Sequence, residues 1–257
     1  MTDESIVRRR FLTLAGRSGA AALLTAACEP VHALSPASPV LPAPSGAPQV
    51  APVTSVTSGA APIPAPADTP LTLNATEYAF VVAAADTFIP ADALSPSGSE
   101  CGVAVFIDRE LAGAFGSGAR VYRSGPFLKG KPEHGYQLPL TPRELFRVGI
   151  AATNDWLIRS QGKPFDALSE AQRASALQAL EHGEAPLHGA PVTEFFEALL
   201  ALTMEGFFAD PIYGGNRDKA SWKMLGYPGL PATYGRVLDS QHGKRFTQAP
   251  QSISDFS

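Results

Sequence analysis

Few side chains in this sequence have the types and spacing that could support chemistry. Glu205 and Asp210 stand five residues apart beside an apolar stretch, and two carboxylates can serve as a general acid and a general base. A helix that continued through Asp210 would place the two on different faces, which favours structural roles. We therefore expect Glu205 to accept hydrogen bonds from backbone donors of the Gly-Gly-Asn turn that comes after it, and Asp210 to cap a helix end.

A second group, His182, Glu184 and His188, brings together side chains that can bind metal ions. They lie in a Gly- and Pro-containing turn, where solvated side chains are the ordinary finding. The sequence shows no partner groups that would orient them as ligands. We interpret them as exposed loop residues. A stand-alone hydrolase or metal-dependent lyase, using these histidines or the two carboxylates, remains the alternative.

Cysteine usage excludes several cofactors. The chain has two cysteines, Cys28 and Cys101, which form no haem-attachment sequence and are too few for an iron–sulfur cluster or a Cys-rich zinc site. Dinucleotide, phosphate-loop and nucleophile-elbow motifs are also missing from the sequence. We therefore predict no cofactor, metal or catalytic residue in this chain. Without Cys28, Cys101 is either a buried, inert thiol or forms an intersubunit disulfide.

The first 28 residues read as an export signal. A twin-arginine pattern is formed by Arg8, Arg9, Phe11 and Leu12. The apolar run after it ends at Ala27, and its uncharged part is too short to span a bilayer as a permanent helix. The order of charge, apolar run and small residues predicts recognition by the twin-arginine translocase and a periplasmic location.

The end of this signal is similar to a lipobox. Small residues directly precede Cys28, which would become the lipidated N-terminus; cleavage near Ala27 without lipid is the alternative. Residues 29–70 then contain eleven prolines and only two Asp or Glu residues, a composition typical of an extended, disordered linker. Such a tether is most useful when its start is anchored, so we predict attachment to the membrane through Cys28.

The remaining residues, 71–257, fit one compact domain. The formal net charge of the chain is −4, and removing the signal, with four arginines against two acidic residues, leaves about −6. An acidic chain without a basic cluster is a poor nucleic-acid binder. We therefore exclude nucleic acid as a partner.

The sequence pattern of this domain predicts an all-α fold with long irregular loops. Capping signals open three helices, at Asn74, Thr141 and Ser169. Further helices are expected over 102–111, 192–209 and 218–225, whereas 112–139 reads as irregular. The expected buried positions recur at helical spacing: Tyr78, Val81, Val82, Ala85 and Ile89; Val103, Phe106, Ile107 and Leu111; Leu145, Val148, Ala152 and Trp156; Leu177 and Leu180; Phe195, Phe196, Leu199, Leu200, Met204, Phe207 and Phe208.

The densest signal lies between residues 204 and 229. Asp210-Pro211 should end the long apolar helix, and Gly214-Gly215-Asn216 allows left-handed backbone angles. Gly226 fits a helix C-cap, with Pro228 shortly after it. The motif residues are Glu205, Phe207, Phe208, Asp210, Pro211, Tyr213, Gly214, Gly215, Asn216, Trp222, Gly226, Tyr227 and Pro228.

These stretches, E-G-F-F-x-D-P-x-Y-G-G-N-x-D and W-x-x-x-G-Y-P-G, resemble the gluconate 2-dehydrogenase subunit 3 family, the small subunit of periplasmic flavin-dependent sugar and sugar-acid dehydrogenases. The same family resemblance extends to the Gly102-Val103 and Leu140-Thr141-Pro142 regions and to the export signal. The resemblance covers residues 72–257. The linker is longer than the family minimum.

The resemblance implies a non-catalytic role. In this family the large subunit binds FAD and oxidises the sugar, and a c-type cytochrome subunit often passes electrons to the membrane. The small subunit assists export, maturation or stability of the flavoprotein. The motif aromatics Tyr213, Trp222 and Tyr227 either contact that partner or pack internally. A lipid-tethered export chaperone with several clients is a further alternative.

Overall fold

The computed structural model describes residues 69–256, apart from positions 120, 129, 132, 133, 135, 188, 232, 234 and 236. These residues belong to the second of two contact units, Pro62–Ser257, and they make up the helical domain. The predicted export signal with Arg8, Arg9, Phe11 and Leu12, the lipidation candidate Cys28, and the predicted linker up to residue 68 lie outside the described residues.

The helices that begin at local capping signals begin where the sequence predicts. The side chains of Asn74, Thr141 and Ser169 each accept a hydrogen bond from the backbone three residues on, and the Glu or Gln there reaches back to the cap. Such boxes satisfy backbone donors that a helix start leaves open. They open α2 (Ala75–Phe88), α4 (Pro142–Gln161) and α5 (Glu170–Glu181).

The other α-helices lack a side-chain cap at their start. They are α3 (Val103–Ala112), α6 (Val192–Phe208), α7 (Ala220–Leu225) and α8 (Leu238–Gln241). The described residues also form short 3₁₀ turns, η2 (Phe165–Ala167), η3 (Pro211–Tyr213), η4 (Arg217–Lys219) and η5 (Ile253–Phe256). The sequence places the start of α7 near Asp218, slightly earlier than the structure does. Asp218 and Lys219 both have φ of 55°, which is left-handed backbone, so the helix can begin only at Ala220.

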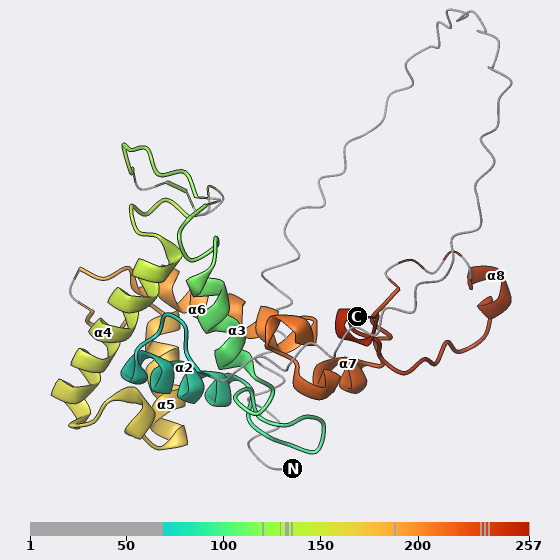
Figure 1. Cartoon of the computed structure of the whole chain (residues 1–257). Coiled ribbons are helices and arrows are strands. Elements are labelled where there is room, and N and C mark those ends of the chain that lie inside the picture. The colour runs from blue at the N-terminus through green and yellow to red at the C-terminus, as the bar shows by residue number, and fades with distance from the viewer. Residues whose placement is uncertain are drawn as a thin grey trace, which may run out of the picture. The chain divides into compact units, whose positions relative to one another are not determined.

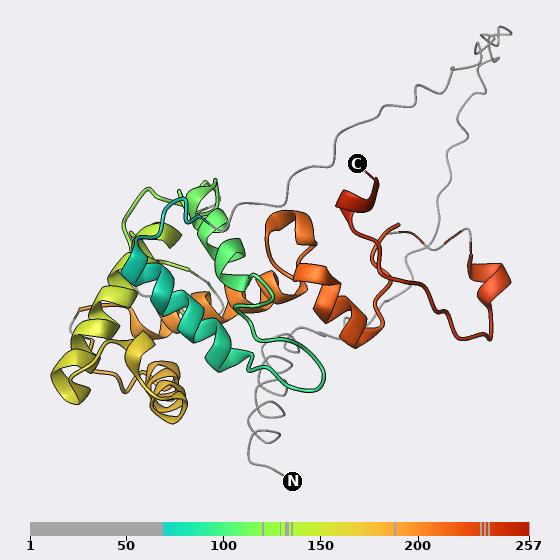
Figure 2. The ribbon, with the colours of Figure 1, turned by 60° about the horizontal axis from the view of Figure 1, so that its bottom comes forward.

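Helices α2 to α6 form the helical body, with α2 and α6 each contacting the other helices of this group (Figures 1 and 2). The all-α prediction is confirmed, since the described residues contain an isolated parallel bridge, Gly229 with Gln251, and no strand. The described part of the 112–139 stretch is irregular, as predicted. Among the described residues, no helix combines the length and apolar character needed to cross a membrane.

Four fully buried phenylalanines form the centre of the core. Phe80 of α2 lies 4.5 Å from Phe165 and 6.1 Å from Phe195 of α6, measured between ring centroids. Phe146 of α4 meets Phe195 edge-on at 5.7 Å. Burying each ring contributes about 2 kcal/mol, so these contacts between distant segments are a main source of stability.

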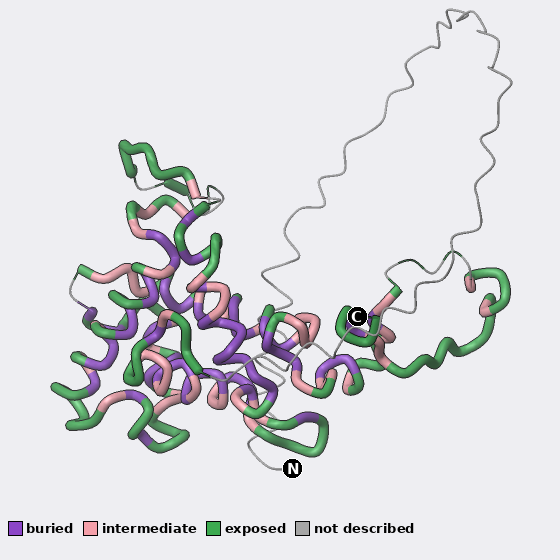
Figure 3. Tube along the Cα trace, viewed as in Figure 1, coloured by how far each residue is buried: buried purple, intermediate pink, exposed green. Residues whose placement is uncertain are grey.

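The buried face of α4 differs from the predicted stripe. Leu145 is buried, but Val148 is exposed and Ala152 and Trp156 are half-buried, while Phe146, Gly149, Ile150, Thr153 and Leu157 form the core side of the helix. Figure 3 shows buried and exposed stretches alternating along α4. Gly149 explains the choice of face. A Cβ on Gly149 would lie 2.3 Å from the ring of Phe195, so the ring of α6 packs directly against the backbone of α4 here. In α2, similarly, Phe80 is buried whereas the predicted Tyr78 and Val82 are half-buried.

A buried carboxylate, that of Asp108, fixes the segment that precedes α2. Asp108 of α3 is 2 % exposed and accepts hydrogen bonds from the backbone N–H groups of Leu71, Thr72 and Leu73 at 2.5, 3.1 and 2.8 Å. These donors precede α2 and lie outside the hydrogen bonds of the helix. The segment 71–73 is therefore fixed to α3.

Candidate functional site

The 204–229 motif forms the end of α6 and a set of tight turns next to it. The last carbonyls of a helix have no partner within the helix, and here two motif side chains supply donors. The indole N–H of Trp222 donates to the carbonyl of Phe208, and Nδ2 of Asn216 donates to that of Ala209, each at 2.9 Å. The motif thus caps its own helix across the intervening turn.

Asn216 is the central polar residue of this turn. It is fully buried and has φ of 46°, a left-handed angle that asparagine tolerates better than most residues. Its Oδ1 accepts from the backbone N–H of Ser221 at 3.0 Å and from the Ser221 hydroxyl at 2.8 Å. One side chain therefore ties the end of α6 to the start of α7.

The glycines allow the turn to lie directly against the helices. A Cβ on Gly215 would be 2.0 Å from the carbonyl oxygen of Gly206 in α6, and a Cβ on Gly206 would be 2.8 Å from the ring of Phe106 in α3. Gly214 has φ of 106° and Gly226, the C-cap of α7, has φ of 69°, as the sequence predicts for this type of turn. The close contacts of Gly215 and Gly206 leave no room for a side chain at either position.

Asp210 has the capping role expected from the sequence. Its Oδ1 accepts from the backbone N–H of Ile212 at 3.0 Å, which caps η3 next to Pro211. Its Oδ2 accepts from the backbone N–H of Ile253 at 2.9 Å, so the same carboxylate holds the end of the chain. Both oxygens have structural roles, which argues against a catalytic acid or base at this position.

Glu205 does not have the role expected from the sequence. Its side chain is exposed on α6, and among the described residues Asn216 and Asp210, not Glu205, accept the backbone donors of the turn. Partial desolvation, and then the negative charge of Glu110 on α3, raise the pKa of the Glu205 carboxyl above its usual value. The folded state thus holds this carboxylate in surroundings that disfavour its charge.

This predicts a stabilising substitution whose effect depends on pH. Unfolded Glu205 ionises near 4.5 and folded Glu205 ionises at higher pH. The penalty is absent below pH 4.5, grows as the pH rises through the folded pKa, and is constant above it. Glu205→Gln should therefore raise the free energy of unfolding at pH 7 by no more than the ~0.5 kcal/mol of ordinary surface changes. Thermal unfolding should show this as a higher melting temperature, and the gain should vanish below pH 4.5. An equal gain at both pH values would contradict the electrostatic explanation.

The motif aromatics divide into buried and exposed ones. Trp222 is buried and meets Tyr227 edge-on at 5.3 Å between ring centroids. Phe207 is buried and touches the half-buried Phe208. Tyr213 is 52 % exposed and Tyr227 is 44 % exposed. Trp222 thus has a packing role, and the two tyrosines present surface that a partner could contact.

The buried thiol of Cys101 lies close to this region. Cys101 is 1 % exposed, and its carbonyl accepts from the backbone N–H of Arg217 at 3.0 Å, next to the Gly-Gly-Asn turn. Burial makes a thiol less reactive. The intersubunit disulfide stays a prediction, and it requires the surrounding turns to open.

The histidine group is not brought together as a site. His182 is the C-cap of α5 and is exposed, Glu184 is also exposed, as the sequence predicts, and His188 lies outside the described residues. Among the residues that the structure describes, no group of three or more His, Cys, Asp or Glu side chains could hold a metal ion.

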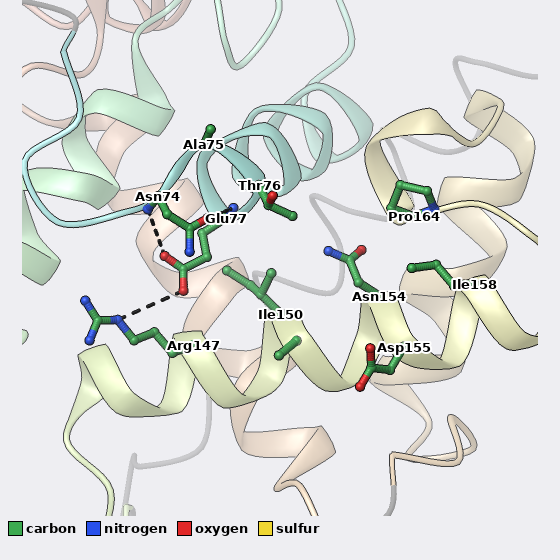
Figure 4. A pocket seen from close by; sticks show the side chains of 11 residues that line it. Asn74, Ala75, Thr76, Glu77, Arg147, Ile150, Asn154, Asp155, Ile158 and Pro164 are labelled. Carbon is green, nitrogen blue, oxygen red and sulfur yellow. Dashed lines mark hydrogen bonds and ion pairs between the residues drawn. The ribbon is translucent and has the colours of Figure 1, made fainter.

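An open pocket lies between the start of α2 and one side of α4 (Figure 4). Its charged pair, Glu77 and Arg147, is 4.0 Å apart, and Glu77 also accepts from the backbone N–H of Asn74 as part of the capping box. Asn154 in its wall accepts from the backbone N–H of Phe165 at 3.0 Å. These polar groups serve the helix ends, and no nucleophile with an adjacent base is among the lining residues.

Sequence reasoning missed two features that complete the motif region. One is Asp108, although a lone carboxylate inside the run Val103–Ile107 and Leu111 is a recognisable signal of a buried acceptor. The other is the C-terminal segment. There, Asp255 accepts from the backbone N–H of Ser252 at 2.7 Å and pairs with Lys219 of η4 at 2.5 Å. The Lys219 hydrogen bond lowers the pKa of the Asp255 carboxyl.

Comparison with known proteins supports a family assignment for this arrangement. The family model described as gluconate 2-dehydrogenase subunit 3 matches residues 75–229, from the first residue of α2 to the end of the motif turns. Comparison with curated proteins and with solved structures gives no match. The family match covers more than half of the chain. It includes the whole 204–229 motif, in which the end of α6 is joined to the Gly-Gly-Asn turn and to Trp222. The chain belongs to the gluconate 2-dehydrogenase subunit 3 family.

Proposed function

We propose that this chain is the non-catalytic small subunit of a periplasmic FAD-dependent sugar or sugar-acid dehydrogenase, and that it assists export, maturation and stability of the flavoprotein subunit. Membership of the family identifies an accessory subunit of a gluconate 2-dehydrogenase-like complex. The partner-specific role goes further and is our proposal, as are FAD in the large subunit and haem c in a third, cytochrome subunit.

One observation carries the proposal. The polar groups of the motif are used to fold it: Asn216, Asp210 and Trp222 have their hydrogen-bonding atoms engaged by the backbone and by Ser221. What the motif presents to solvent is aromatic surface from Tyr213 and Tyr227. A site with satisfied polar groups and exposed aromatics suits protein binding better than catalysis.

The export signal supports the rest of the proposal. Twin-arginine export moves folded proteins, so a flavoprotein that already holds its FAD can cross the membrane with a subunit that carries the signal. Arg8, Arg9, Phe11 and Leu12 would direct the pair to the translocase, and a lipid on Cys28 would hold it at the membrane through the proline-rich linker.

Purification of the full chain from native membranes in mild detergent tests this proposal. We expect a flavoprotein at one-to-one stoichiometry, a flavin absorbance spectrum, and haem bands if a cytochrome is present. An Arg8→Lys, Arg9→Lys chain should leave the flavoprotein in the cytoplasm. A colourless single chain, or sugar oxidation by this chain alone, would refute the accessory role, and many substoichiometric clients would indicate a general export chaperone.

A further inference from the structure

The end of the chain returns to the motif and is fixed there. The backbone N–H of Leu230 donates to the carbonyl of Gln251 at 2.9 Å, and the N–H of Gln251 donates to that of Pro228 at 3.0 Å. A Cβ on Gly229 would lie 2.1 Å from the same Gln251 oxygen, so only glycine permits this approach. With the contacts of Asp210 to Ile253 and of Lys219 to Asp255, η5 is attached to η3 and η4.

This attachment assembles an exposed apolar surface, here called the C-terminal face. Its members are large apolar residues of η3, of the end of α7 and of η5, which the hydrogen bonds above hold in adjoining elements. They are Tyr213 (52 % exposed), Leu225 (62 %), Tyr227 (44 %), Ile253 (38 %) and Phe256 (64 %). Apolar side chains gathered on fixed backbone mark interaction sites more often than scattered ones do. In Figure 3 the tube from α7 to the C-terminus is mostly coloured exposed or intermediate.

The face has an exposed cation at its edge. The elements η3, η4, α7 and η5 hold Arg217, Lys219 and Lys223 against Asp218 and Asp255, and Lys219 pairs with Asp255. Lys223 of α7 is exposed, two residues before Leu225. An apolar face with an exposed lysine at its edge is complementary to a partner whose apolar patch has an acidic rim.

The face also crosses the boundary of the family match. Tyr213, Leu225 and Tyr227 lie within residues 75–229, and Ile253 and Phe256 lie beyond them. The surface therefore combines residues inside the family match with residues outside it. Such a combination can give a shared docking position with a contribution that is specific to one pair of subunits.

We infer that the C-terminal face is the docking surface for the flavoprotein subunit, through an apolar patch with an acidic rim on that subunit, and that Ile253 and Phe256 set the selectivity for its own flavoprotein. This inference rests on the proposed function and names the surface through which it acts. The buried part of the motif then serves to hold this surface in shape.

The test is co-expression of the full chain with the flavoprotein, followed by measurement of their dissociation constant. The double variant Ile253→Ser, Phe256→Ser should bind at least tenfold more weakly, as expected for apolar residues central to an interface. The matched control is Leu94→Ser, Val148→Ser, whose parent residues are 67 % and 39 % exposed and lie in the loop between α2 and α3 and in α4. The control should bind like the parent, and both variants should keep the parent's melting temperature.

A charge variant provides a second measurement that does not depend on apolar contacts. Lys223→Glu should slow association severalfold at low salt, and the difference should shrink as salt is added. Binding of the Ile253/Phe256 variant as tightly as the parent would overturn the inference and leave the proposed function standing. Failure of the parent chain itself to bind the flavoprotein would overturn both. The parent chain could also bind phosphatidylserine-containing vesicles. If the Ile253/Phe256 variant lost that binding but still bound the flavoprotein, the face would dock on lipid instead.

Discussion

Asp108→Ala is expected to lower the free energy of unfolding by about 2–4 kcal/mol, because hydrogen bonds to a charged acceptor are each worth about 1.5–3 kcal/mol and three end on this carboxylate. The acceptor is buried in α3, and its donors are the consecutive N–H groups of Leu71, Thr72 and Leu73. Part of the loss is recovered when the freed segment reaches water, which keeps the expected value below the sum of three bonds. Urea unfolding of the full chain measures it.

Hydrogen exchange distinguishes this anchoring from a general loss of stability. In the Asp108→Ala chain the amides of Leu71, Thr72 and Leu73 should exchange rapidly under native conditions, while those in the middle of α4 remain protected. The control is Asp166→Ala, which removes an exposed carboxylate of η2 and should change stability by less than ~0.5 kcal/mol. Protected amides at 71–73 in the Asp108 variant would show that the anchor lies elsewhere.

Asn216→Ala is expected to lower the free energy of unfolding by about 3 kcal/mol, because it removes three hydrogen bonds from a fully buried position. It leaves the Ala209 carbonyl and the Ser221 N–H without their partner, and it places a Cβ-bearing residue without a polar side chain at φ of 46°. Detachment of α7 from α6 should also weaken the Trp222 hydrogen bond to Phe208. Thermal unfolding and the tryptophan emission maximum, which should move to longer wavelength, are the measurements.

Asn216→Gly separates the two causes. Glycine adopts left-handed angles freely, so this variant should be about 1 kcal/mol more stable than Asn216→Ala but still well below the parent chain. If alanine and glycine are equally harmful, backbone strain makes no contribution at this turn. If both leave stability unchanged, the buried hydrogen bonds of Asn216 are not what joins α6 to α7.

The two positions also connect folding with the proposed partner role. Asp108 fixes the segment 71–73, which precedes α2, and Asn216 fixes the elements that carry Tyr213, Leu225 and Tyr227. Neither residue is exposed, so neither can contact a partner directly. If an Asn216 variant binds the flavoprotein more weakly, the cause is therefore a change in the shape of the C-terminal face. The spectral change at Trp222 should accompany the weaker binding.

Local signals in the sequence determined most of the helix starts and the helical class of the fold. Asn74, Thr141 and Ser169 begin helices because the groups that cap them lie only three residues away, so no tertiary contact is needed to form the cap. The Gly-Gly-Asn turn and the Gly226 C-cap are local for the same reason. The motif that identifies the family is a continuous stretch, which is why it can be recognised without its geometry.

The tertiary structure decided which groups these elements bring together. Spacing along α4 allowed more than one apolar face, and the ring of Phe195 against Gly149 selected the one that includes Phe146 and Ile150. Asp108 meets donors 35 to 37 residues away, and η5 joins the C-terminal face because Gln251 returns to Gly229 and Ile253 to Asp210. These contacts join segments far apart in the chain, and their geometry depends on how whole helices pack, which residue periodicity does not encode.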